Sequence, residues 1–98
     1  MLTSKQRAIL RSQANSLDPV FQIGKGESDE TMTRSVSECL AVRELIKLKV
    51  LESSLYRARE AADRMAQATG ADVVQVIGSK FVLYLQKEKD SKYADLLR

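Results

Sequence analysis

The sequence lacks histidine and tryptophan and contains one cysteine and one proline in 98 residues. Without histidine, the most common acid–base catalyst and zinc ligand is missing, and Cys39 alone forms neither an intrachain disulfide nor a His/Cys zinc site. No apolar run approaches the roughly 18 residues that cross a bilayer, and no signal peptide is apparent after Met1. We therefore expect no enzymatic activity, no metal or other cofactor, no membrane or small-molecule partner, and a cytoplasmic location.

The composition is that of one small globular domain. Hydrophobic residues make up 44% of the chain and charged residues 30%, which is enough apolar side chain for a core. Lysine and arginine number 16 against 13 aspartate and glutamate, giving a net charge of +3. This mild excess favours a polyanionic partner, and the placement of the cations matters more than their total.

Hydrophobic periodicity divides the chain into helices and strands. The expected elements are a helix over 3–14 capped by Thr3 or Ser4, a strand over 20–23, a helix starting at Ser28, a strand over 44–51, a helix from Ser53 or Ser54 through Thr69, and strands over 72–77 and 80–86. This order, α-β-α-β-α-β-β, predicts an α/β two-layer sandwich. We expect a four-stranded mixed sheet with helices on one face, preceded by an extra helix.

Spacing within these elements predicts which side chains are buried. In the second helix, the inner face comprises Met32, Val36, Cys39, Leu40 and Arg43, so Cys39 is expected to pack in the core. In the third helix, the inner stripe comprises Leu55, Ala58, Ala62 and Met65, with Gly70 just past its end. Between acidic residues, Arg57, Arg59 and Arg64 are expected to form local ion pairs on a solvated face.

The tripeptide Gly24-Lys25-Gly26 lies between a predicted strand and a predicted helix, where phosphate-binding loops also occur. The dinucleotide fingerprint requires a third glycine where Asp29 stands, and a P-loop requires a glycine-lysine pair followed by serine or threonine. Two interpretations remain. The loop is either a nucleic-acid clamp, in which small residues let a sugar-phosphate backbone approach Lys25, or a plain strand-to-helix turn.

Four segments together resemble one protein family: residues 2–7 (LTSKQR), 19–26 (PVFQIGKG), 43–50 (RELIKLKV) and 76–84, where VIG is followed by FVLY. In this order they are similar to the bacterial YhbY proteins, the single-domain relatives of the plant CRM splicing-factor domain. The resemblance covers about residues 1–86, which we expect to form a single RNA-binding domain. Residues 87–98 are then a charged C-terminal tail.

The resemblance implies a fold similar to the C-terminal domain of bacterial initiation factor three, an RNA-binding surface, and association with ribosomal RNA in precursors of the large ribosomal subunit. The family's Gly-x-x-Gly loop falls on residues 24–27, where Glu27 replaces the last glycine and adds negative charge near a helix N-terminus. Leu85 stands where the family commonly has arginine or lysine.

We therefore expect a non-catalytic RNA-binding module that acts in large-subunit assembly. The expected RNA-binding residues are basic groups, loop glycines and one aromatic that could stack on a base: Lys5, Arg7, Arg11, Gly24, Lys25, Gly26, Arg43, Lys47, Lys49, Lys80 and Tyr84. The alternative is a protein-interaction module in a ribosome-associated complex, using the outer sheet face or the apolar pair Leu96-Leu97. A DNA-binding helix-turn-helix is disfavoured, because no two predicted helices are joined by a short turn.

Overall fold

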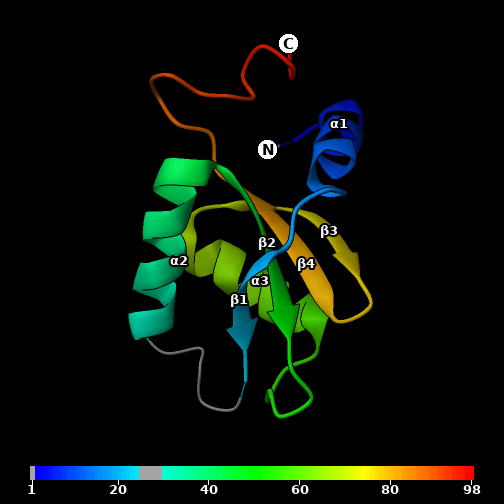
Figure 1. The fold of residues 1–98 in the computed structure, drawn as a ribbon, viewed down its shortest axis with the longest axis vertical. Coiled ribbons are helices and arrows are strands. Elements are labelled where there is room, and N and C mark those ends of the chain that lie inside the picture. Colours follow the sequence, from blue (N-terminus) through cyan, green and yellow to red (C-terminus); the bar gives the residue numbers. More distant parts are fainter. Residues whose placement is uncertain (1, 25–29) are drawn as a thin grey trace.

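The computed structural model describes residues 2–24 and 30–98. Within these residues the chain forms seven elements in the order that the sequence predicts. Their bounds are α1 Ser4–Ala14, β1 Pro19–Ile23, α2 Glu30–Arg43, β2 Leu45–Val50, α3 Ala58–Thr69, β3 Asp72–Ile77 and β4 Lys80–Tyr84 (Figure 1). The predicted start of the second helix, Ser28, lies outside the described residues.

The strands form one mixed sheet in the order β1-β2-β4-β3. Strands β1 and β2 are parallel, since α2 carries the chain back between them, whereas β4 is antiparallel to both β2 and β3. The β3–β4 hairpin turns at Gly78, whose φ of 57° suits glycine. The prediction of an α/β fold with a four-stranded mixed sheet is confirmed.

Alternation along the strands sends side chains into two separate cores. On the inner face, Leu48 and Phe81 are fully buried in the core that α2 and α3 cover. On the outer face, Leu45 and Val82 are buried together with Leu10 of α1. Helices α2 and α3 thus share one face as predicted, and the extra helix α1, which the sequence pattern does not place, packs on the opposite face at the upper end of the molecule (Figure 1).

Helix α1 begins where its capping residue indicates. The Thr3 Oγ1 accepts the backbone N–H of Gln6 at 3.1 Å, and the Gln6 Oε1 accepts the backbone N–H of Thr3 at 2.9 Å. This reciprocal pair is a capping box, which satisfies two of the free N–H groups at a helix start. The cap therefore fixes the residue at which α1 begins.

Helix α2 buries the face that its spacing predicts. Val36 and Leu40 are fully buried, and Met32 and Cys39 pack against the inner core while partly exposed. Cys39 is therefore a packing residue, as expected. Arg43, the last residue of the predicted face, is exposed instead.

Helix α3 begins later than predicted, at Ala58 rather than at Ser53 or Ser54. The Ser54 hydroxyl instead closes a turn, in which it accepts the Tyr56 N–H at 3.2 Å and donates to the Tyr56 carbonyl at 2.9 Å. Leu55, which was expected on the inner stripe, is consequently 70% exposed. The rest of the stripe is buried as predicted: Ala58, Ala62 and Met65.

Gly70 ends α3 in the left-handed conformation, with φ of 80°, and its N–H donates to the Ala66 carbonyl at 2.8 Å. A Cβ at this position would meet nothing within 4 Å, so a substitution encounters only the backbone cost of positive φ. We expect Gly70→Ala to lower the free energy of unfolding by about 1 kcal/mol in urea denaturation. The exposed Gln67→Ala variant is the control, and an equal loss in both would contradict this role for Gly70.

Residues 87–98 pack against the domain. Leu97 is buried in the outer core, and its carbonyl accepts a hydrogen bond from the Gln6 Nε2 at 3.0 Å. The Tyr93 ring meets the Tyr84 ring edge-on, with centroids 5.8 Å apart. The C-terminal segment therefore covers the outer face beside α1 (Figure 1).

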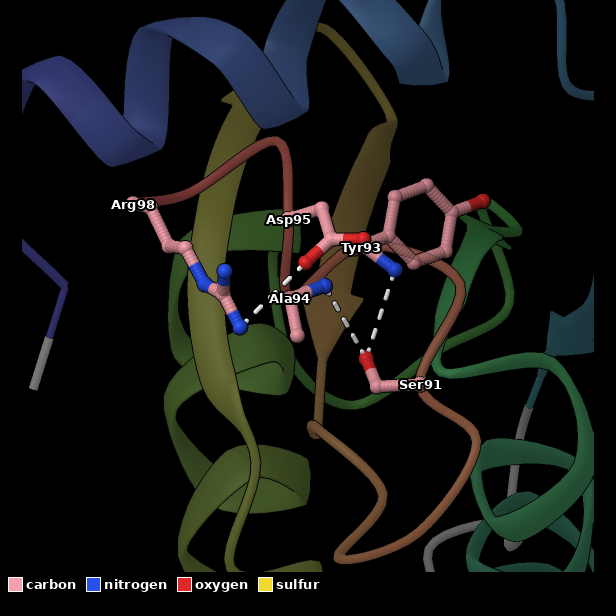
Figure 2. A network of polar contacts seen from close by, with 5 residues as sticks. All are labelled: Ser91, Tyr93, Ala94, Asp95 and Arg98. Carbon is pink, nitrogen blue, oxygen red and sulfur yellow. Dashed lines mark hydrogen bonds and ion pairs between the residues drawn. The ribbon is translucent and has the colours of Figure 1, made fainter.

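Ser91 organises the last turn of the chain. Its Oγ accepts the backbone N–H groups of Tyr93 and Ala94 at 3.3 and 3.1 Å (Figure 2). Further along, Arg98 pairs with Asp95 at 3.5 Å, an exposed contact of little energetic weight. The hydroxyl thus acts as a local cap that shapes the segment leading to Leu97.

Glu44, between α2 and β2, binds this C-terminal segment. It is fully buried, and its φ of 65° places a non-glycine residue in the left-handed region. Its Oε1 accepts the Lys92 N–H at 2.7 Å, while its Oε2 accepts the Ser91 hydroxyl and the Lys87 N–H. Burial raises the pKa of Glu44, but the hydrogen bonds from Ser91, Lys92 and Lys87 together outweigh it, so the pKa lies below the ordinary value.

Candidate functional site

Three of the lysines expected to bind RNA lie together on the outer face of the sheet: Lys47, Lys49 and Lys80, hereafter the sheet-face lysine cluster. Lys49 of β2 stands directly opposite Lys80 of β4, and Gln22 of β1 is its partner on the other side. Lys47 and Lys49 are half-buried and Lys80 is exposed. Lys47 stands opposite Val82 of the outer core, and Lys49 and Lys80 lie beyond that core, at the end of the strands away from Leu45.

The Lys49–Lys80 pair carries an energetic cost. Like charges directly opposite each other in an antiparallel pair destabilise the sheet, by a fraction of a kcal/mol. Within residues 2–24 and 30–98, no carboxylate forms an ion pair with any lysine of the cluster; the ion pairs there are all formed by arginines. A bound polyanion would remove this repulsion, which is why the cluster is the strongest candidate site.

The candidate loop begins at the same end of the sheet as the cluster. Gly24 follows β1 directly and is buried, and β1 runs parallel to β2, so both strands end there. At this end the Val50 N–H donates to the Ser79 carbonyl at 2.6 Å, which joins the end of β2 to the hairpin. A hollow of about 540 Å³ lies between the segment that follows β2 and the β3–β4 hairpin. The expected binding residues Lys25 and Gly26, and also Glu27, lie outside the described residues.

Tyr84 does not take the role expected for it. It is 2% exposed, its hydroxyl donates to the Gln86 Oε1 at 3.2 Å, and its ring packs against Tyr93. The prediction that Tyr84 stacks on a base is wrong, because the C-terminal segment covers the ring. The residues next to Tyr84 in the sequence do not indicate that the C-terminal segment packs over its ring.

The other predicted cations do not join the cluster. Arg43 is exposed at the end of α2, close to the start of β2, whereas Lys49 lies about 13 Å further along that strand. Lys5 is exposed on α1. Arg7 and Arg11, also on α1, line a groove along β3. The structure therefore divides the predicted binding residues among separate surfaces.

The arginines of α3 form the ion pairs expected from their spacing, Arg59 with Asp63 at 3.4 Å and Arg64 with Glu60 at 4.0 Å. Two further contacts were not predicted. The Arg64 guanidinium stacks 4.1 Å from the centre of the Tyr56 ring, and Arg59 lines the groove along β3. Helical spacing alone cannot show these contacts, because each depends on a residue from another part of the chain.

The described residues hold neither a candidate metal-ion site nor a candidate membrane-spanning helix. Among them, no group of three His, Cys, Asp or Glu side chains is placed to hold a metal ion. No helix in the same ranges is both long and apolar enough to cross a membrane.

Known proteins resemble this chain over nearly its whole length. The CRS1 / YhbY (CRM) domain model matches residues 2–84. A Bacillus subtilis relative named probable RNA-binding protein YqeI is 38% identical over 96 residues, covering 98% of this chain and 99% of the relative. A probable RNA-binding protein of Methanocaldococcus jannaschii is 38% identical over 94 residues, covering 94% of this chain and 69% of the relative. An RNA-binding protein of Haemophilus influenzae is 31% identical over 88 residues, covering 90% of this chain and 89% of the relative.

A solved structure shares the fold. The solution structure of a Staphylococcus aureus protein, described as a candidate RNA-binding protein, matches with a TM-score of 0.79 and 42% sequence identity. The match covers 94% of this chain and 96% of that one. The names of these relatives are those of RNA-binding proteins rather than enzymes.

Proposed function

Because the chain belongs to the CRS1 / YhbY (CRM) domain family, we propose that it binds RNA through the sheet-face lysine cluster. The observation that carries the proposal is the Lys49–Lys80 pair, two cations held face to face without a carboxylate partner among the described residues. The position of Gly24 at the same end of the sheet supports it. So do the names of the relatives.

The chemistry of the cluster favours contacts to the RNA backbone. Lysine ammonium groups act as point charges that pair with phosphates and carry no base information themselves. Adjacent strands lie about 4.8 Å apart, and the long side chains of Lys49 and Lys80 can spread to reach successive phosphates. We therefore infer binding that depends on charge more than on sequence.

Wild-type binding should depend strongly on salt. If each lysine of the cluster neutralises one phosphate of a single strand, log Kd should rise with log salt with a slope of at least about 2, since each contact contributes about 0.7. Fluorescence anisotropy with a labelled single-stranded RNA at several salt concentrations measures this slope. A flat salt dependence would contradict binding through these lysines.

We further propose that the RNA is ribosomal RNA in precursors of the large subunit and that the protein acts in assembly without catalysis. The resemblance to the YhbY proteins supports this partner. A sucrose gradient of cell lysate tests it: the protein should sediment with large-subunit particles and move to the top after RNase treatment. Sedimentation only at the top of an untreated gradient would contradict the ribosomal partner.

A further inference from the structure

A second basic surface lies along the free edge of the sheet. A groove of about 590 Å³, hereafter the β3-edge groove, is lined by Arg7, Arg11, Arg59 and residues 73–76. Among the described residues, β3 is an edge strand, since it pairs only with β4. Arg7 and Arg11 come from α1 on the outer face, whereas Arg59 comes from α3 on the inner face. Arginines from both faces therefore converge on one edge.

Arg7 is held in position at this edge. Its Nε donates to the Val73 carbonyl at 3.3 Å, and the side chain is half-buried. This bond uses one donor of the guanidinium and leaves its two terminal amino groups for another acceptor. A guanidinium fixed in this way loses less conformational freedom when it binds an anion.

Within the described residues, ion pairs with carboxylates do little to neutralise the arginines of the groove. Neither Arg7 nor Arg11 forms an ion pair there, and Arg59 pairs only with Asp63, where both side chains are more than half exposed. An exposed pair of this kind is worth at most about 1 kcal/mol and exchanges readily for a phosphate.

The geometry of β3 argues against an added peptide strand. Strand addition needs a regular row of free backbone groups. Arg7 already occupies the Val73 carbonyl, and the pairing register of β3 shifts between Val73 and Gln75. Both features interrupt the row, so the edge suits phosphate groups better than an extended acidic peptide.

We propose that the β3-edge groove binds the phosphate backbone of a second RNA segment, beyond the segment held by the sheet-face lysine cluster. The inference rests on the proposed RNA-binding function. Arginine forks pair with phosphate oxygens in a bidentate manner. Lys80 pairs with Ile77 of β3, so the two surfaces flank the same hairpin and one long RNA can contact both.

The double variant Arg11→Gln, Arg59→Gln tests the groove without disturbing the Arg7–Val73 anchor. For single-stranded RNA of about 24 nucleotides, we expect about a tenfold loss of affinity and a salt slope smaller by about 1.4. For RNA of about 6 nucleotides, which the lysine cluster can hold alone, the loss should stay below about twofold. The matched control is Arg34→Gln, Arg98→Gln, which removes the same charge from exposed sites outside the groove.

Amide NMR spectra of the wild type provide the second measurement. Addition of the long RNA should shift the resonances of residues 73–76. If the groove variant binds the long RNA as tightly as the wild type and the amide resonances do not shift, the inference is overturned, while the proposed role of the lysine cluster stands. An equal loss of affinity in the control variant also overturns the inference. Shifts with a poly-glutamate peptide but not with RNA overturn it in favour of a protein partner. A wild type that binds neither RNA removes the proposed function and the inference together.

Discussion

The double substitution Lys49→Glu, Lys80→Glu is expected to weaken binding to single-stranded RNA on the order of a hundredfold at about 0.1 M salt. The two lysines face each other across β2 and β4, so the change converts the centre of the lysine cluster from attraction to repulsion of phosphate. The fold should persist, since Lys80 is exposed and Lys49 half-buried, and neither belongs to a core. Anisotropy titrations give the affinity, and thermal unfolding checks the fold.

A matched control separates the cluster from net charge. Arg34→Glu, Lys89→Glu lowers the net charge by the same four units, from +3 to −1, at exposed positions away from the sheet face. It should weaken binding by less than about tenfold. The milder pair Lys49→Gln, Lys80→Gln should lose about tenfold and reduce the salt slope by about 1.4. Equal losses in the reversed pair and its control would show that RNA binds elsewhere.

Short-range sequence signals predicted most of the fold. The helix start at Thr3, the glycine just past α3 and the strand that carries Lys47 and Lys49 depend mainly on neighbouring residues, and each is found in the structure. The pairing of Lys49 with Lys80 needs the register of two strands, which sequence spacing does not supply. The lysines were therefore predicted one by one, and the structure shows that they form a cluster.

The errors have a common physical origin in long-range packing. Tyr84 was expected as an aromatic that could stack on a base, yet residues from the C-terminal segment cover it. Arg59 lies on the solvated helix face expected for it, but the groove that it shares with Arg11 of α1 was not expected. Glu44 was assigned to the strand over 44–51, yet β2 begins at Leu45 and the Glu44 carboxylate binds the C-terminal segment. In each case the contact joins segments far apart in sequence, and only the folded chain reveals it.

Glu44→Gln is expected to lower the free energy of unfolding by about 2 to 3 kcal/mol. The carboxylate accepts hydrogen bonds from three donors, and both of its oxygens are used. A glutamine must turn its NH₂ group towards one set of donors, so that buried donors face each other. Urea denaturation measures the loss. The exposed Glu38→Gln on α2 is the control and should change stability by less than about 0.5 kcal/mol.

Two further variants test whether the carboxylate acts through the C-terminal segment. Ser91→Ala removes one donor to Glu44. The double variant Ser91→Ala, Glu44→Gln should therefore lose less stability than the sum of the two single losses, with a coupling of about 1 kcal/mol. Glu44→Gly relieves the positive φ but removes the carboxylate, and it should still be less stable than the wild type. Additive effects, or a glycine variant more stable than the wild type, would show that the backbone rather than the carboxylate matters here.

The contribution of Glu44 should also depend on pH with a definite sign. Its pKa is lowered in the folded protein, so the folded state binds the proton less tightly than the unfolded state does. The stabilisation is therefore complete above the unfolded value, near 4.5, and is lost as pH falls through the lower folded value. The stability difference between wild type and Glu44→Gln should shrink as the pH falls below about 5, through the unfolded value near 4.5 and towards the lower folded value. A difference that stays constant over this range would mean that the charge on Glu44 does not hold the C-terminal segment. RNA affinity at neutral pH should be nearly the same in both proteins, because Lys49 and Lys80 lie at the other end of β2 from Glu44.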